Sequence, residues 1–269
     1  MLVAPMLVAP MLNVGIVGMG VIGRHVAEAI GAGIPGVALA GVTVRDPSKA
    51  HGHRALGLEW LIRESNIVVE AATQDALREI APQVLAAGRH LMVLSVGGLV
   101  GVLDEWARLA EKHGCRILVP SGAIAGLDGM KGAREAGITS VTMETRKPPR
   151  GLAGAPWIRQ QQIDLDAITK ETLVFEGPAT EAVKAFPANV NVVAAVSLAS
   201  IGPDKTRIRI YAVPGQERNQ HRVTIEGEFG RLMIEIENVP SENPRTGKLS
   251  YLSAIAMLRE LGASVQIGN

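Results

Sequence analysis

One histidine stands apart from the others in this chain. His221 opens the alternating stretch HRVTIEG behind the polar cluster RNQ, whereas the other five histidines lie in the first half. An imidazole has a reference pKa of about 6.5, so it can exchange a proton near neutral pH in either direction. From the start of a strand, this side chain could project toward a cleft. His221 is therefore a candidate acid–base residue; the plainer alternative is a solvated histidine at a sheet edge.

A second stretch with chemical meaning is the glycine-rich turn GMGVIG at residues 18–23. It has the spacing G-x-G-x-x-G, follows the apolar run MLNVGIV directly and leads into a helical pattern. In this context Gly18 makes the tight turn, Gly20 lets the backbone approach a pyrophosphate, and Gly23 permits close helix–strand packing. The helix N-terminus would face the phosphates. The predicted cofactor contacts here are Gly18, Gly20, Val21, Ile22 and Gly23.

The pair Arg45-Asp46 follows the next apolar run. An acidic residue at this position would hydrogen-bond to the ribose 2′-hydroxyl of NAD, whereas the arginine would accept the 2′-phosphate of NADP. A solvated turn that caps the next helix is the alternative. The pair leaves the cofactor open as NAD or NADP.

The elements that must position these residues change character near residue 138. Before it, strand and helix patterns alternate, which predicts βαβ units and a parallel sheet. After it, the strand patterns alternate apolar and polar residues, which is typical of a mostly antiparallel sheet with one wet face. The expected strands are 11–17, 37–44, 67–73, 90–98, a strand from 115, 138–147, 206–213, 221–229 and 231–239. The expected helices include 21–33, 77–88, 102–114 and 248–264.

These patterns predict an α/β chain with two domains. Residues 11–125 would form a Rossmann dinucleotide-binding domain. Residues 126–245 would form a smaller α+β domain for substrate binding and dimerisation, and residues 246–269 a closing helix that packs back on the first domain. The apolar repeat MLVAPMLVAP at residues 1–10 is left out of this division; prolines and the lack of basic residues make it unlike a secretory signal.

Composition excludes several classes of function. The chain of 269 residues has 27 Lys and Arg against 26 Asp and Glu, so no basic footprint for nucleic acid exists. No apolar run approaches the ~20 residues of a membrane span. The single cysteine, Cys115, excludes an intramolecular disulfide and fits a reducing cytoplasm. His51 and His53 have no third ligand with useful spacing, so no metal site is expected.

Several segments, taken in order, resemble the L-aspartate dehydrogenase family. They are GIVGMGVIG, VVEAAT, PSGAIAGLDG, FPANVNVVAAVSLASIGPDKT, NQHRVTIEGEFG and ENPRTGKLS. The first is generic, whereas the fourth and fifth are specific. The resemblance implies an NAD(P)-dependent enzyme that interconverts L-aspartate and oxaloacetate plus ammonia through iminoaspartate, and that would supply NAD biosynthesis. A related reductase of another small amino or imino acid and a non-catalytic NAD(P)H-binding redox sensor are the alternatives.

The resemblance also implies roles for single residues. His221 would be the active-site residue that activates water and shuttles protons, and Ala125 and Asn191 would touch the nicotinamide. Gly247 and Val213 depart from the family pattern, where a serine and an acidic residue are more usual.

A substrate with two carboxylates needs cationic or polar partners, and an arginine can hold a carboxylate with two hydrogen bonds. The candidates are Arg146, Lys147, Lys205, Arg207, Asn243 and Thr246. The exposed sheet of the second domain predicts a homodimer, because such faces often pair across a two-fold axis.

Overall fold

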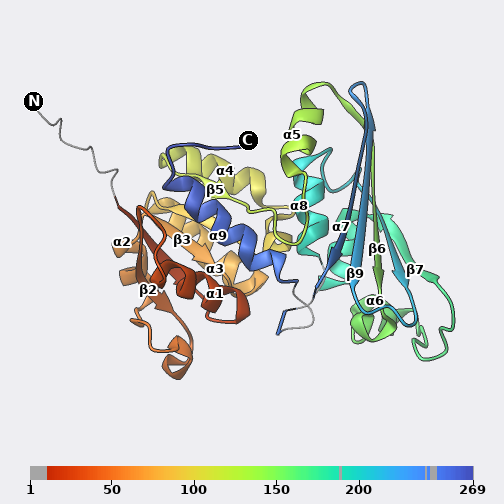
Figure 1. Cartoon of the computed structure of the whole chain (residues 1–269), viewed down its shortest axis with the longest axis horizontal. Coiled ribbons are helices and arrows are strands. Elements are labelled where there is room, and N and C mark those ends of the chain that lie inside the picture. The colour runs from red at the N-terminus through yellow and green to blue at the C-terminus, as the bar shows by residue number, and fades with distance from the viewer. Residues whose placement is uncertain (1–10, 188–189, 240, 243–246, 269) are drawn as a thin grey trace, which may run out of the picture.

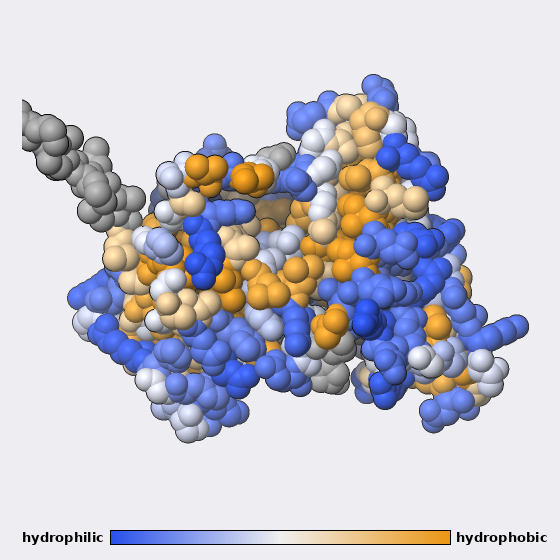
Figure 2. Space-filling model, viewed as in Figure 1, coloured by the Kyte–Doolittle hydropathy of each residue, from blue (hydrophilic) through white to orange (hydrophobic). Residues whose placement is uncertain are grey.

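The structure is a computed structural model that describes residues 11–187, 190–239, 241–242 and 247–268 (Figure 1). Two five-stranded sheets stand beside each other, one in each half of the chain. In Figure 2, apolar residues gather along the hollowed boundary between the two halves, whereas polar residues cover most of the outer surface.

The first sheet is parallel, with the order β2-β1-β3-β4-β5. The chain turns one way from β1 to β2 and the other way into β3, so a crevice opens between β1 and β3 at the carboxyl ends of the strands. Its strands are β1 Leu12–Val17, β2 Val37–Thr43, β3 Ile67–Glu70, β4 His90–Val93 and β5 Ile117–Leu118. Its helices are α1 Val21–Gly31, α2 Leu58–Glu64, α3 Gln74–Ala86 and α4 Leu103–Lys112, with 3₁₀ turns at Pro47–Ala50 and Val96–Leu99.

The expected strand at 90–98 is too long. β4 ends at Val93, and Val96–Leu99 forms a 3₁₀ turn. The buried Glu70 carboxylate draws the chain away from the strand direction, because it accepts hydrogen bonds from the Ser95 backbone N–H at 3.0 Å and the Ser95 hydroxyl at 2.9 Å. An apolar run alone does not reveal where such a polar anchor ends a strand.

The second sheet has the order β10-β9-β6-β8-β7 and is antiparallel except for the β6–β8 pair, as predicted. One face packs on helices around buried residues such as Met143, Val223 and Ile225, and the other face is polar. Its strands are β6 Ile138–Lys147, β7 Thr172–Pro178, β8 Arg207–Ala212, β9 Asn219–Gly227 and β10 Gly230–Asn238. Its helices are α5 Leu127–Glu135, α6 Pro156–Gln160, α7 Ala179–Ala185 and α8 Asn191–Ala199, with a 3₁₀ turn at Pro149–Leu152.

The last helix, α9 (Leu249–Leu261), leaves the second sheet and lies along α1 (Figure 1). Its residues Ala254 and Leu258 are buried in the core of the first half. At its start, the Tyr251 ring stacks on the His25 ring with the centroids 4.1 Å apart. The chain therefore crosses between the two halves twice, and the packing of α9 on α1 ties the end of the second half to the first half.

The three glycines of the turn after β1 meet different surroundings. Gly18 has a φ of +92°, and a Cβ there would lie 2.7 Å from the Ala71 carbonyl oxygen. A Cβ on Gly23 would lie 2.0 Å from the Gly18 carbonyl oxygen. A Cβ on Gly20 would have no heavy atom within 4 Å. The fold itself requires Gly18 and Gly23, whereas Gly20 borders open space.

This difference predicts that two alanine variants will differ in stability. Gly23→Ala should lower the free energy of unfolding by about 3 kcal/mol, because the new methyl group overlaps backbone that cannot move aside cheaply. Gly20→Ala should change it by less than ~1 kcal/mol, since its Cβ meets nothing. Chemical denaturation followed by circular dichroism measures both. Equal losses in the two variants would contradict this account of the turn.

Candidate active site

A cavity of about 440 Å³ opens at the carboxyl ends of the first sheet, where the second half closes over it. Ile22 from the first turn of α1 lies on its wall, with the loops that follow β3, β4 and β5. The second half contributes Lys147, Asn191, Asn219, His221 and Asn238. Parallel α/β sheets bind their ligands at this edge, so the cavity is the candidate site.

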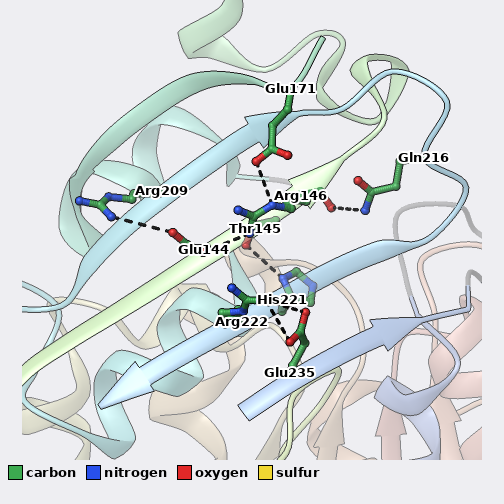
Figure 3. A network of polar contacts seen from close by, with 9 residues as sticks. All are labelled: Glu144, Thr145, Arg146, Glu171, Arg209, Gln216, His221, Arg222 and Glu235. Carbon is green, nitrogen blue, oxygen red and sulfur yellow. Dashed lines mark hydrogen bonds and ion pairs between the residues drawn. The ribbon is translucent and has the colours of Figure 1, made fainter. Parts of the chain in front are cut away.

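His221 is the third residue of β9 and is buried, with 5% of its surface exposed. Its Nδ1 lies 3.0 Å from the hydroxyl oxygen of Thr145, which is directly opposite in the β6–β9 ladder (Figure 3). Burial, and next the positive charge of Lys147, lower the pKa of His221 to about 3. With its pKa lowered below the reference value of about 6.5 expected from the residue type, the imidazole is neutral at neutral pH. Its part in proton exchange stays a prediction.

Lys147 ends β6 and is also buried, with 6% of its surface exposed. Side chains alternate along a strand, so Lys147 shares the inner face of the sheet with Thr145. Burial lowers the pKa of Lys147 to about 8. Among the described residues that line the cavity, Lys147 and His221 are the ionisable ones.

Arg146 projects from the opposite face of β6 (Figure 3). Its guanidinium donates hydrogen bonds to Glu144 at 3.1 Å and to Glu171 at 3.0 Å, and lies 4.7 Å from the Tyr211 ring centre. This candidate for carboxylate binding is thus engaged away from the cavity.

The other substrate candidates do not lie on the described wall of the cavity either. Lys205 and Arg207 are exposed beside the start of β8, and Arg207 pairs with Glu176 at 3.1 Å. Asn243 and Thr246 lie outside the described residues. Of the cationic candidates, the structure brings Lys147 alone to the cavity wall.

The predicted nicotinamide contacts separate. Asn191, the first residue of α8, lines the cavity, and its side-chain oxygen accepts from the Gly97 N–H at 3.1 Å. Ala125 lines a second cavity of about 590 Å³ instead. Ala123 borders the first cavity, and its carbonyl accepts from the Asn238 amide at 2.9 Å. Contact between Ala125 and the nicotinamide stays a prediction.

At the end of β2, Arg45 and Asp46 are exposed. The Asp46 carboxylate accepts hydrogen bonds from the Ser48 N–H at 3.0 Å and its hydroxyl at 2.7 Å, so it caps the 3₁₀ turn that begins at Pro47. Arg45 and Asp46 thus form a solvated turn that caps the next helical turn, and the cofactor stays open as NAD or NADP.

The turn after β1 fits a dinucleotide. The N-terminus of α1 has no side-chain cap, Gly20 leaves open space above it, and Ile22 reaches the cavity. Free backbone N–H groups at a helix N-terminus and room for close approach suit a pyrophosphate. Across the described residues, no group of three or more His, Cys, Asp or Glu side chains is arranged to hold a metal ion.

Three polar residues of the site escaped the sequence analysis: Glu70, Thr145 and Asn238. Glu70 is fully buried at the end of β3 and joins the loops after β3 and β4, accepting from the Ala72 N–H at 2.8 Å as well as from Ser95. Burial raises its pKa. An acid inside the apolar run IVVEAAT was the available signal. Thr145 and Asn238 each occupy a position of the apolar face of an alternating strand, so a polar residue in that register was the available signal.

Comparison with known proteins agrees with this geometry. A profile described as "Aspartate dehydrogenase, C-terminal" matches residues 128–261, and one described as "Homoserine dehydrogenase, NAD binding domain" matches residues 18–120. The L-aspartate dehydrogenase of Methanosarcina barkeri is 51% identical over 223 residues, which cover 82% of each chain. The chain belongs to the L-aspartate dehydrogenase family. The resemblance seen in its sequence is thereby confirmed.

More distant members of the family support the same assignment. The L-aspartate dehydrogenase of Bradyrhizobium diazoefficiens is 43% identical over 241 residues, or 87% of this chain and 86% of that one. The crystal structure of aspartate dehydrogenase from Thermotoga maritima matches with a TM-score of 0.77 at 26% identity, covering 96% of this chain and 99% of that chain. Within the described residues, none of the helices has both the length and the apolar character needed to cross a bilayer.

The burial of Lys147 predicts a stability that depends on pH. Burial disfavours the charged amine of Lys147, so its pKa is about 8 in the folded state against 10.5 in the unfolded chain. Lys147 therefore costs stability at pH 7, where it is charged in both states. This cost disappears as pH rises from about 8 to 10.5. Lys147→Met should therefore raise the free energy of unfolding at pH 7 by up to ~3 kcal/mol, with a gain that shrinks over that range. Denaturant titrations at several pH values measure this, with the exposed Lys205→Met as control. A gain that does not depend on pH would refute the assignment.

Proposed function

We propose that this chain is an NAD(P)-dependent L-aspartate dehydrogenase, which interconverts L-aspartate and oxaloacetate plus ammonia through iminoaspartate. The observation that carries the proposal is the pair His221 and Lys147, buried together on the wall of a cavity beside the dinucleotide turn. Relatives at 51% and 43% identity bear this activity in their names. In this role the enzyme would supply iminoaspartate to NAD biosynthesis.

The cofactor is NAD or NADP, and when bound it supplies the nicotinamide ring that accepts the hydride from the substrate Cα. We assign its pyrophosphate to the N-terminus of α1 and its nicotinamide to the cavity near Asn191. Arg45 and Asp46 would lie near the adenosine ribose and decide between the two cofactors. The predicted pyrophosphate contacts are Gly18, Gly20, Val21, Ile22 and Gly23.

His221 is the proposed catalytic residue, and Lys147 the residue assigned to the substrate. Both side chains face the cavity from the inner side of the second sheet. An anionic substrate is attracted to a cavity wall with a lysine and no carboxylate among its described residues. L-Aspartate and oxaloacetate both carry two carboxylates, so this charge favours their binding.

We also infer a cytoplasmic homodimer. The outer face of the second sheet carries arginine and glutamate side chains side by side. Figure 3 shows Arg209 with Glu144, and Arg222 with Glu235. Arg209 also pairs with Glu176. A surface with both charges interspersed is able to pair with a copy of itself across a two-fold axis. The buried free thiol of Cys115 is compatible with a reducing cytoplasm.

The activity is tested by following the absorbance of reduced nicotinamide with oxaloacetate, ammonium and either NADH or NADPH. We expect oxidation that requires ammonium, and a decrease in kcat of about 10²- to 10³-fold in His221→Ala. His113 is partly exposed and lines neither cavity, so His113→Ala is the matched control and should behave as the wild type. Oxidation without ammonium would indicate a hydroxy-acid dehydrogenase instead, and full activity in His221→Ala would remove His221 from the mechanism.

A further inference from the structure

The hydroxyl of Thr145 fixes how the imidazole of His221 is presented to the cavity. Both side chains are buried to the same degree, with 5% exposed, and the two residues are opposite each other in the β6–β9 ladder. The distance from the Thr145 hydroxyl to Nδ1 is 3.0 Å. Because backbone pairing sets this contact, it does not depend on a mobile side chain finding its partner.

This contact selects one tautomer of the imidazole. Among the described residues, Nδ1 of His221 is the hydrogen-bond partner of the Thr145 hydroxyl. If Nδ1 carried the ring hydrogen, the hydroxyl could only accept, and its own hydrogen would have no acceptor among these residues. A buried donor left in that state costs ~1–3 kcal/mol. A hydroxyl that donates to Nδ1 avoids this cost, and the ring hydrogen then lies on Nε2.

The charge state of the ring agrees with this arrangement. Burial and the nearby Lys147 lower the pKa of His221 to about 3, so the ring stays neutral at neutral pH. A neutral imidazole with its hydrogen on Nε2 is a hydrogen-bond donor and a poor base. A neutral histidine that polarises a substrate oxygen is a known enzymatic device.

Lys147 has the complementary properties. Its burial lowers its pKa to about 8, so both of its protonation states are accessible near neutral pH. Among the described residues of the cavity wall, the elements around Lys147 contribute polar rather than acidic side chains. These are His221 and Asn219 from β9, Asn238 from β10 and Asn191 from α8. On β6 itself, the ion-paired Glu144 and Arg146 project from the other face.

We propose that His221 acts as a neutral Nε2–H donor, held in that tautomer by the positioning residue Thr145, and that Lys147 carries the protons that the reaction moves. This inference rests on the proposed function and divides its chemistry between two residues. It replaces the shuttle role expected for His221.

The proton transfers balance as follows in the direction of aspartate oxidation. The α-ammonium loses one proton to neutral Lys147, which passes it to bulk water; the hydride then leaves Cα with its electron pair, giving the iminium. Water oxygen bonds to Cα, the C=N π pair moves to nitrogen, and the water's proton goes to Lys147 and on to that nitrogen. The C–N bond breaks with its pair on nitrogen, the second C–O bond forms, and the hydroxyl proton goes through Lys147 to ammonia. Once the C–O bond has formed, the Nε2–H of His221 donates to that oxygen, and His221 loses no proton.

The tautomer is measured by NMR on protein labelled with ¹⁵N-histidine, with His221 identified by the signal lost in His221→Gln. We expect an unprotonated Nδ1 and a protonated Nε2 in the wild type. Thr145→Val should give a mixture of tautomers and lower kcat about fivefold with little change in KM, and Thr145→Ser should restore both. A protonated Nδ1 in the wild type would overturn the proposal.

The division of labour is tested by two pairs of variants. The side-chain nitrogen of glutamine can take the place of Nε2–H as a donor but cannot act as a base, so His221→Gln should keep at least about ten times the kcat of His221→Ala. The rise of kcat with pH near the Lys147 pKa of about 8 should persist in His221→Gln. It should vanish in Lys147→Arg, whose guanidinium does not deprotonate.

The results separate this inference from the function on which it rests. Equal loss in His221→Gln and His221→Ala, or a pH-dependent rise that vanishes with His221 and persists in Lys147→Arg, would overturn the division of labour and leave the dehydrogenase intact. Absence of any ammonium-dependent oxidation in the wild type would instead overturn the proposed function.

Discussion

The antiparallel register between β6 and β9 is the constraint on which the site depends. It sets Thr145 opposite His221 and brings Lys147 to the same inner face. It also sends Arg146 outward, into ion pairs with glutamates. Because side chains alternate along a strand, a slip of one residue would exchange the two faces. The same pairing that buries the core of the second half therefore also decides which cation faces the cavity.

Burial gives these residues their chemistry. In water, His221 would titrate near pH 6.5 and Lys147 near pH 10.5; beneath the cavity wall, the histidine stays neutral and the lysine moves to about 8. The cavity that both residues line closes where the loops of the first sheet meet the second half. The helix α9, which returns from the second half to α1, helps to keep these two walls together.

Glu70 performs a related task on the cofactor side. Its buried carboxylate joins the loops after β3 and β4, both of which line the cavity. With Gly18 and Gly23 fixing the turn after β1, the first half presents a preformed edge of backbone groups. Gly20 alone faces open space there, which suits a ligand that must approach the main chain closely.

The sequence by itself determined the periodicities, and these placed most elements correctly. It predicted the parallel sheet, the mostly antiparallel second sheet and the dinucleotide turn, since each depends on residues adjacent in the chain. The specific segments around Asn191 and His221 indicated the family, which the comparisons confirmed. These features are local, so a linear pattern can record them.

Only the tertiary structure decided which residues meet at the cavity and in what charge state. Neighbours in sequence, Arg146 and Lys147, separate to opposite faces; Ala123 borders the site cavity while Ala125 lines another. The end of β4 follows from a carboxylate 25 residues earlier in the chain. The low pKa of His221 follows from burial and a charge on another strand. Such effects arise from contacts between distant segments and from the exclusion of water, which local sequence patterns do not encode.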